Sequence, residues 1–213
     1  MGQLPECRVD VTQPFMNTGV DYAGPIHMRV SRGRGQKSYK GYIAVFVCMA
    51  TKAVHLEPVS ELTTEAFMAA LRRFFARRGK SSHIYSDNGT NFVGAARKIE
   101  KEYADALKNN SEVAAVLASE NIKWHFNPPG APHFGGIWEA AVKSVKHHLR
   151  RVIGEAKLTF EEMATLLSQV EGVLNSWPLC ELSGNPEYID VLTPGHFLVG
   201  TLLLAMPESR KKT

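Results

Sequence analysis

Three acidic residues of this 213-residue chain lie at positions where a carboxylate could have a functional role. Asp21 lies within an otherwise apolar, strand-like stretch, where a charge is disfavoured and costly to bury. Asp87 directly follows a short strand-like run, and Glu139 lies in the first turn of a predicted helix. Each has an ordinary explanation when taken alone: a bulge for Asp21, a tight turn for Asp87, and complementarity to the helix dipole for Glu139.

Three carboxylates that meet at one edge of a sheet have a shared chemistry. They repel one another and raise each other's pKa, and divalent cations offset that repulsion. Oxygen ligands suit Mg²⁺ or Mn²⁺ better than zinc. Two such ions about 3.5–4 Å apart can hold a scissile phosphate and stabilise both the attacking and the leaving oxygen. We therefore predict that Asp21, Asp87 and Glu139 are catalytic residues that together ligate a pair of metal ions.

The stretch that carries Glu139 also carries a row of cations. Residues 127–136 contain three prolines and three glycines, which predicts a loop, and we expect it to move beside the acid. The helix that follows has an apolar face made of Ile137, Ala141, Val145, Leu149 and Val152. Its opposite face carries Glu139, Lys143, Lys146 and Arg150. This pattern is typical of an enzyme that holds a polyanion along a helix, although a plain amphipathic surface helix remains the alternative.

The elements that must position these residues can be predicted from periodicity. Strands are expected at residues 15–30 (broken near the Gly24-Pro25 pair), 39–49, 53–58, 83–86 and 123–126. Helices are expected at residues 63–78, 94–109, 112–120, 137–152 and 159–176. Three successive strands followed by β-α alternation predict an α/β fold with a mixed sheet of about five strands, flanked by helices.

Several other features have simpler interpretations. The arginines that end the helix at 63–78 are interpreted as a solvated helix end, where the helix dipole favours cations: Arg72, Arg73, Arg77 and Arg78. The cations around the first hairpin are interpreted as a solvated loop, with a contact to a DNA backbone as the alternative: Arg29, Arg32, Arg34, Lys37 and Lys40. Trp124, Trp138 and Trp177 are interpreted as core or interface anchors.

Composition places the chain among ordinary soluble proteins, with 44% hydrophobic and 22% charged residues and a modest net charge of +4. No apolar run has the length of a membrane span, and the N-terminus lacks a signal-peptide pattern. The three cysteines form no pair or quartet at zinc spacing. We expect an intracellular protein of the nucleus or cytoplasm, neither secreted nor bound to a membrane.

The motifs around the three acids resemble those of a known family. The segments GVDYAGP, SDNGTNF and HFGGIWEAAVKSVK are similar to the three catalytic motifs of the retroviral-type integrase core, a member of the ribonuclease-H-like polynucleotidyl transferases. More narrowly, PPGAPHFGGIWEAAVKSVKHHLRRVIG, LTFEEMATLLSQVEGVLNS and LTPGHFLVG resemble the integrase of BEL/Pao-type LTR retrotransposons. The resemblance covers nearly the whole chain, and the acidic triad of the family falls on Asp21, Asp87 and Glu139.

The resemblance implies a fold, an activity and partners. It implies a ribonuclease-H-like five-stranded sheet and a Mg²⁺-dependent polynucleotidyl transferase that processes DNA 3′ ends and transfers strands. The implied partners are element ends, target DNA and further copies of the chain. DNA would lie along the helix of the third acid, so the expected contacts are Lys143, Lys146, Arg150 and, in the preceding loop, His133. The domain reading is a lead-in at 1–12, the catalytic core at 13–177, and an extension with a basic tail at 178–213.

The sequence departs from the family pattern at several points and leaves two other functions open. Trp177 stands before Pro178 where the family usually has Arg, and residues 200–204 lack an expected Arg-Pro. Neither a His/Cys zinc module before the core nor a small β-barrel after it is recognisable, as in a trimmed or host-adopted form. The alternatives are a domesticated DNA- or protein-binding scaffold without catalysis, and a structure-specific ribonuclease that uses the same metals.

Overall fold

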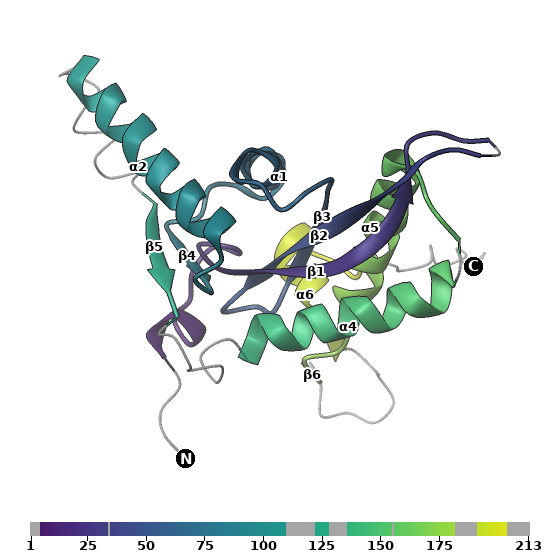
Figure 1. Ribbon diagram of the computed structural model, residues 1–213. Coiled ribbons are helices and arrows are strands. Elements are labelled where there is room, and N and C mark those ends of the chain that lie inside the picture. Colours follow the sequence, from purple (N-terminus) through teal and green to yellow (C-terminus); the bar gives the residue numbers. More distant parts are fainter. Residues whose placement is uncertain are drawn as a thin grey trace, which may run out of the picture.

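The centre of the structure is a mixed five-stranded sheet with the order β3-β2-β1-β4-β5 (Figure 1). This computed structural model describes residues 5–33, 35–109, 122–127, 136–154, 156–181 and 191–203. The strands are β1 (Asn17–Arg29), β2 (Ser38–Cys48), β3 (Val54–Val59), β4 (His83–Ser86) and β5 (Lys123–Phe126). The first three strands form an antiparallel meander. β4 pairs with β1 in parallel, and β5 pairs with β4 in parallel. The predicted fold class is therefore confirmed.

Helices cover both faces of this sheet. They are η1 (Glu6–Arg8), α1 (Thr64–Arg78), α2 (Thr90–Asn109), α4 (Gly136–Ile153), α5 (Phe160–Leu174) and α6 (Pro194–Val199). Buried side chains place α1 and α2 on one face, and α4 and α5 on the other (Figure 1). A small two-stranded sheet pairs β6 (Cys180–Glu181) with β7 (Val191–Leu192). Among the described residues, no helix is long and apolar enough to cross a membrane.

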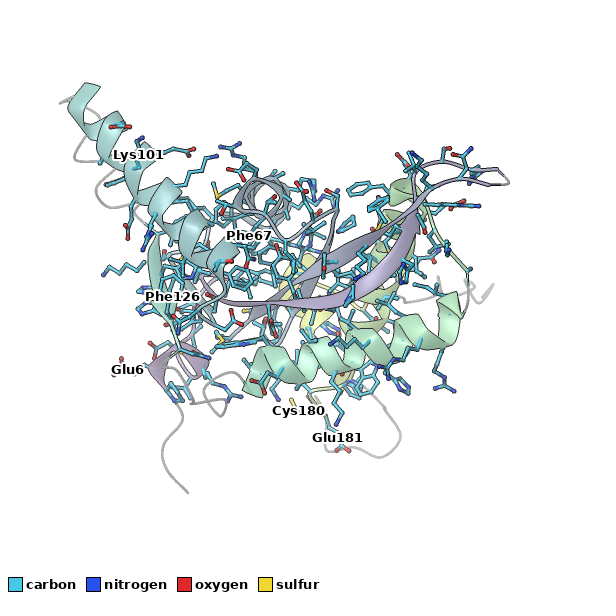
Figure 2. The ribbon with its side chains drawn as sticks, in the orientation of Figure 1. Glu6, Phe67, Lys101, Phe126, Cys180 and Glu181 are labelled. Atoms are coloured by element: carbon cyan, nitrogen blue, oxygen red, sulfur yellow. The ribbon has the colours of Figure 1, made fainter. Side chains whose placement is uncertain are left out.

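The face under α1 and α2 is an aromatic core. The rings of Phe46 on β2 and Phe74 on α1 stack with their centroids 4.3 Å apart. Phe67 packs between α1 and the sheet and meets Phe92 of α2 edge to face (Figure 2). Because Phe92 must reach this core, α2 begins at Thr90 and not at the predicted residue 94. The helix predicted at 112–120 lies outside the described residues.

The face under α4 and α5 is aliphatic. The buried residues of α4 are Trp138, Val142, Val145 and Leu149. The predicted apolar face was therefore rotated, since Val152 is 63% exposed and Trp138 is only 3% exposed. The bulk of the Trp138 ring decides which stripe of the helix meets the sheet. The short elements β6, β7 and α6 were missed because two to six residues are too few to show a period.

The end of α5 covers the outer edge of β3. The Asn175 side chain accepts a hydrogen bond from the Val54 N–H at 2.8 Å and donates one to the Val54 carbonyl at 2.8 Å. The Glu171 carboxylate accepts a hydrogen bond from the Leu56 N–H, also at 2.8 Å. Every residue of β3 is buried, although its sequence alternates like that of a half-exposed strand. An edge that would otherwise attract another chain is thus capped by side chains.

The polar residues of β3 are buried because they join an ionic cluster with α1 and α5. His55 and Glu57 are each 1% exposed and lie 3.0 Å apart, from Nε2 to Oε1. The second ring nitrogen of His55 lies 3.2 Å from Glu171. Arg73 donates to Glu57 at 2.6 Å, and Arg78 pairs with Glu171. We refer to these five residues as the β3 ionic cluster.

The interpretation of the α1 arginines as a solvated helix end was therefore wrong for Arg73 and Arg78, which these pairs partly cover. Arg77 also reaches Glu57 at 3.3 Å, and Arg72 pairs with Glu102 at 3.5 Å, but both side chains stay more than half exposed. Side chains from β3, α1, α2 and α5 had to meet before these pairs could form.

The interpretation of the hairpin cations as a solvated loop was wrong for Arg29. Arg29 and Arg32 pair with Glu162 of α5 at 3.1 and 2.9 Å, but the side chain of Arg32 stays 79% exposed, and Lys37 and Lys40 are exposed as well. The Thr159 N–H and these arginines lower the pKa of Glu162 to about 2. Arg34 lies outside the described residues.

The pKa shifts in the β3 ionic cluster all favour its charged form. Burial alone would lower the pKa of His55, but hydrogen bonds to Glu171 and Glu57 outweigh it and raise that pKa. Burial alone would raise the pKa values of both glutamates, but His55 and the arginines lower them. The cluster therefore stabilises the fold most between the ordinary pKa of Glu, 4.5, and that of His, 6.5.

We predict that His55→Gln lowers the free energy of unfolding by about 2–4 kcal/mol at about pH 6, because hydrogen bonds to charged groups contribute about 1.5–3 kcal/mol each. The difference from the wild type should narrow as the pH rises through the raised pKa of His55. It should also narrow as the pH falls through the lowered pKa values of Glu57 and Glu171. Urea unfolding across this range measures it, with the exposed His27→Gln as the control. A difference that keeps growing on the alkaline side would contradict a charged His55.

Candidate active site

The parallel pairing of β1 and β4 brings two of the three predicted acids level. The register pairs Thr18 with Ile84 and Gly19 with Tyr85. Continued by two residues, it sets Asp21 beside Asp87. Because β4 ends at Ser86 while β1 runs on to Arg29, Asp21 lies where β1 loses its neighbour on that side. Asp21 is in the middle of its strand but at an open notch of the sheet, which explains a carboxylate at this position.

The third acid is positioned by a close contact between α4 and β1. An added Cβ on Gly19 would lie 2.4 Å from Cε3 of Trp138, so only a residue without a side chain admits this ring. Gly19 and Asp21 face the same side of β1, because side chains alternate along a strand. Trp138 therefore holds the first turn of α4, with the exposed Glu139 on it, over the face that carries Asp21.

Electrostatics show that the three acids share one neighbourhood. Burial raises the pKa of Asp21, and the negative charges of Asp87 and Glu139 raise it further. The Tyr22 N–H, which donates to the Asp21 carboxylate at 2.7 Å, and the charge of Lys146 act in the opposite direction.

The end of β4 is fixed by hydrogen bonds. The Asp87 carboxylate accepts a hydrogen bond from the Gly89 N–H at 2.9 Å. The Ser86 hydroxyl donates to the Asp87 carbonyl at 2.8 Å and accepts from the Trp124 ring N–H at 2.9 Å. The backbone that carries Asp87 is thus held from both sides.

The acids are close but do not yet form a complete ligand set. Among the residues that the structure describes, no three carboxylate, imidazole or thiol groups are gathered tightly enough to hold one ion. The donors that converge are oxygen atoms, two of them on exposed side chains that can rotate. Their mutual repulsion is what a divalent cation would relieve, so the residues fit Mg²⁺ or Mn²⁺.

A depression of about 660 Å³ runs along α4, and Glu139 lines one end of it. Its lining includes Lys143, Lys146, Arg150, Arg151, His147, His148 and Trp177. We call it the cationic depression. Lys146 links it to the acids, because its charge acts on Asp21. His133, the fourth predicted DNA contact, lies outside the described residues.

The α4 cations differ from the other clustered cations. Arg29, Arg32, Arg72, Arg73, Arg77 and Arg78 all form ion pairs. Within the described part of the chain, no lysine or arginine of α4 has a carboxylate within 4.0 Å. Lys143 and Arg150 are exposed, and Lys146 is half-buried. Their charge is therefore available to an outside anion.

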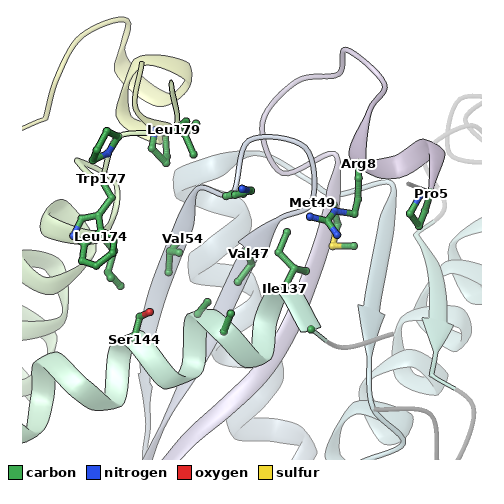
Figure 3. A pocket seen from close by; sticks show the side chains of 16 residues that line it. Pro5, Arg8, Val47, Met49, Val54, Ile137, Ser144, Leu174, Trp177 and Leu179 are labelled. Carbon is green, nitrogen blue, oxygen red and sulfur yellow. The ribbon is translucent and has the colours of Figure 1, made fainter. Parts of the chain in front are cut away.

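A second hollow, of about 690 Å³, lies along another side of α4 (Figure 3). Ile137 and Ser144 of α4, Val47 of β2 and Leu179 line it, and Trp177 borders both hollows. It contains none of the three acids, and its walls are mainly carbon. This apolar pocket is therefore separate from the group of three acids.

Two features of the site escaped the sequence interpretation. Trp138 was expected to be an anchor and is one, but its partner Gly19 was not singled out. Trp177 was expected in a core or an interface and is 58% exposed in this structure. The available signals were two short spacings: Gly19 lies two residues before Asp21 in the strand, and Trp138 lies next to Glu139 in the helix.

Comparison with solved structures identifies the fold class. One chain of the cryo-EM structure of the simian T-cell lymphotropic virus intasome, in complex with PP2A regulatory subunit B56 gamma, matches with a TM-score of 0.55 and 17% identity. The match covers 100% of this chain and 65% of that one. The molecule therefore has the ribonuclease-H-like integrase fold, and it spans about two thirds of the intasome chain's length.

The family follows from the sequence itself. Residues 20–132, more than half of the chain, match the integrase core domain, and the chain belongs to that family. The matched segment contains Asp21 and Asp87 and ends before Glu139. No curated protein matches the chain.

The HTLV-2 integrase catalytic core domain in complex with magnesium is also similar. Its trimeric form matches with a TM-score of 0.49 and 17% identity, covering 87% of this chain and 97% of that one. Its dimeric form has a TM-score of 0.47 and 18% identity, covering 81% and 93%.

We predict that Gly19→Ala lowers the free energy of unfolding by about 1–3 kcal/mol, because the new methyl group displaces the Trp138 ring from a packed interface. Thermal unfolding measures the loss. Gly136→Ala is the matched control, since the first residue of α4 has open space around it. Alanine also favours a helix, so this control should be neutral or slightly stabilising. An equal effect of both substitutions would contradict the role given to the Gly19–Trp138 contact.

Proposed function

We propose that this protein is the catalytic core of an integrase that cuts and joins DNA, of the BEL/Pao retrotransposon type. One arrangement carries the proposal: the β1–β4 register sets Asp21 beside Asp87, and the contact of α4 with β1 holds the first turn of α4, with Glu139, over the face that carries Asp21. An unpaired row of cations on α4 begins beside these acids. The narrower assignment rests on the motif resemblance alone.

The carboxylates of Asp21, Asp87 and Glu139 would hold Mg²⁺ or Mn²⁺. Asp21 and Asp87 would bind one ion and would share the ligation of the second ion with Glu139. When bound, a pair of such ions stabilises negative charge on the attacking and leaving oxygens of a phosphoryl transfer. Lys143, Lys146 and Arg150 bind the phosphates of the strand and orient it. These contacts position DNA without reading its bases, so binding should depend strongly on salt and little on sequence.

The proposed reaction has two steps on the same kind of bond. In the first, water attacks the phosphorus of a phosphodiester near a DNA 3′ end, and the bond from phosphorus to the 3′ oxygen breaks. The DNA keeps a new 3′ hydroxyl, and a short fragment with a 5′ phosphate is released. In the second, that hydroxyl oxygen attacks a target phosphodiester, so that one P–O bond forms as another breaks. The number of ester bonds is unchanged in the joining step, and no energy-rich cofactor is needed.

Joining the two ends of one DNA to a target requires two active sites held at a fixed spacing. The described part of one chain offers one such group of three acids, so we propose that the protein acts as a homo-oligomer. The substrate also places its activity inside the cell, in the nucleus or cytoplasm.

We predict that Glu139→Gln reduces metal-dependent strand transfer by about a thousandfold or more, because the second ion loses its carboxylate ligand. DNA binding in EDTA should be unchanged or slightly tighter, since one negative charge is removed. Glu161→Gln is the matched control: Glu161 is likewise an exposed glutamate in the first turn of a helix, α5. A Glu139→Gln protein that still joins DNA with Mg²⁺ would refute the assignment.

A second candidate is a DNA-binding scaffold without catalysis. It is favoured by the incomplete ligand set among the described residues. The same assay separates the two, because a scaffold binds DNA equally well with Mg²⁺, Mn²⁺ or EDTA and cuts it in none of them.

We predict that Lys143→Ala combined with Arg150→Ala weakens DNA binding and makes its dependence on salt shallower. Each lost phosphate contact should reduce the slope of log K against log salt by about 0.9, or about 2 for the pair. Fluorescence anisotropy at several salt concentrations measures the slope. Arg72→Ala, which removes an exposed cation already paired with Glu102, should leave the slope unchanged. Equal slopes for the double variant and the wild type would show that DNA does not follow α4.

A further inference from the structure

Trp177 has an unusual position for a large aromatic residue. It follows the C-terminus of α5, and it is 58% exposed. Its ring meets His148 of α4 edge to face, with the centroids 6.4 Å apart. Tryptophan is enriched where proteins contact other molecules, because its large ring buries much apolar surface.

The surroundings of Trp177 indicate what that molecule is. Trp177 lines the cationic depression together with Lys146, Arg150 and Arg151. Within the described residues these cations have no carboxylate partner. An aromatic ring among cations that follow a phosphate backbone is the arrangement by which proteins hold unpaired nucleic acid, since every base offers a face for stacking.

We propose that Trp177 is a stacking platform for an unpaired base of the DNA strand whose phosphates lie along α4. The proposal rests on the proposed function and adds to it a subsite for a nucleobase. Arg150 and Arg151 hold the phosphates that flank this base, and His148 supports the Trp177 ring from α4.

Helix geometry gives the distance between this subsite and the acids. Glu139 and His148 are nine residues apart on α4, which is about 13 Å along the helix axis. Stacked nucleotides advance about 3.4 Å each along a strand. A strand with this stacked spacing would place about four nucleotides between the base on Trp177 and the phosphate beside Glu139. The proposal requires that the base on Trp177 is unpaired, because only then is its face free to stack.

The apolar pocket offers a competing occupant, because Trp177 also borders that hollow beside Leu174 and Leu179 (Figure 3). A protein partner or a second copy of the chain would use this apolar side. The cations on the other side favour DNA, and the experiment decides between them.

The test compares two DNA probes in EDTA, so that binding is measured without cleavage. One probe is a duplex with a single-stranded extension of about four nucleotides, and the other is blunt. Trp177→Ala should bind the extended probe roughly tenfold more weakly and the blunt probe within about twofold of the wild type. Trp177→Phe should retain most of the affinity, because a ring remains.

Two controls isolate stacking from other effects. Phe197→Ala removes an aromatic side chain that is 44% exposed and does not line the depression, so it should change neither probe. An extension that has the phosphates but no bases should reduce wild-type binding to the level of Trp177→Ala. Thermal unfolding confirms that each variant is folded.

Each other outcome overturns the proposal in a distinguishable way. If Trp177→Ala binds both probes equally more weakly than the wild type, Trp177 has a general role in DNA binding. If the substitution changes only the oligomeric state, measured by sedimentation, Trp177 belongs to a protein interface. If the wild type joins DNA with Mg²⁺ while Trp177→Ala shows the same ratio of affinities for the two probes as the wild type, only the stacking role fails. If the wild type binds neither probe, the proposed function fails as well.

Discussion

The contact between the Trp138 ring and the bare backbone of Gly19 holds α4 against β1, and the candidate site depends on it. Two of the acids are set by the sheet itself, since the parallel register carries Asp21 level with Asp87. Glu139 belongs to a helix that no strand register controls. A large ring seated on a glycine fixes both the height and the rotation of that helix, because an interior at close packing leaves one arrangement for a rigid group.

Two sets of clustered cations differ in their partners. Arg29 and Arg32 of the first hairpin and the four arginines of α1 are paired with Glu57, Glu102, Glu162 and Glu171, and these pairs hold elements together. The cations of α4, in the described part of the chain, are unpaired. A net charge of +4 therefore understates the attraction for a polyanion, because the unpaired charge is concentrated on one helix face beside the acids.

Local signals predicted most of the fold, and long-range pairing decided what they missed. The strands β4 and β5 have the predicted bounds, and the Thr159–Glu162 capping box begins α5 as expected, because these features depend on neighbouring residues. The β3 ionic cluster was missed because its members come from three elements, and because Glu171 has no local signature and is far along the chain from the other four. Among the site residues, type and spacing identified the acids, but exposure of Trp177 depends on how α5 ends against α4.

The same helix forms a wall of two hollows of different chemistry. One side of α4 presents Glu139 and the unpaired cations, while another presents Ile137 and Ser144 to the apolar pocket. The cations proposed to bind DNA therefore share a side of α4 with Glu139, and the apolar pocket lies on another side. A molecule in the apolar pocket would contact the same helix as the DNA without covering the acids, and Trp177, which borders both hollows, is where the two would meet.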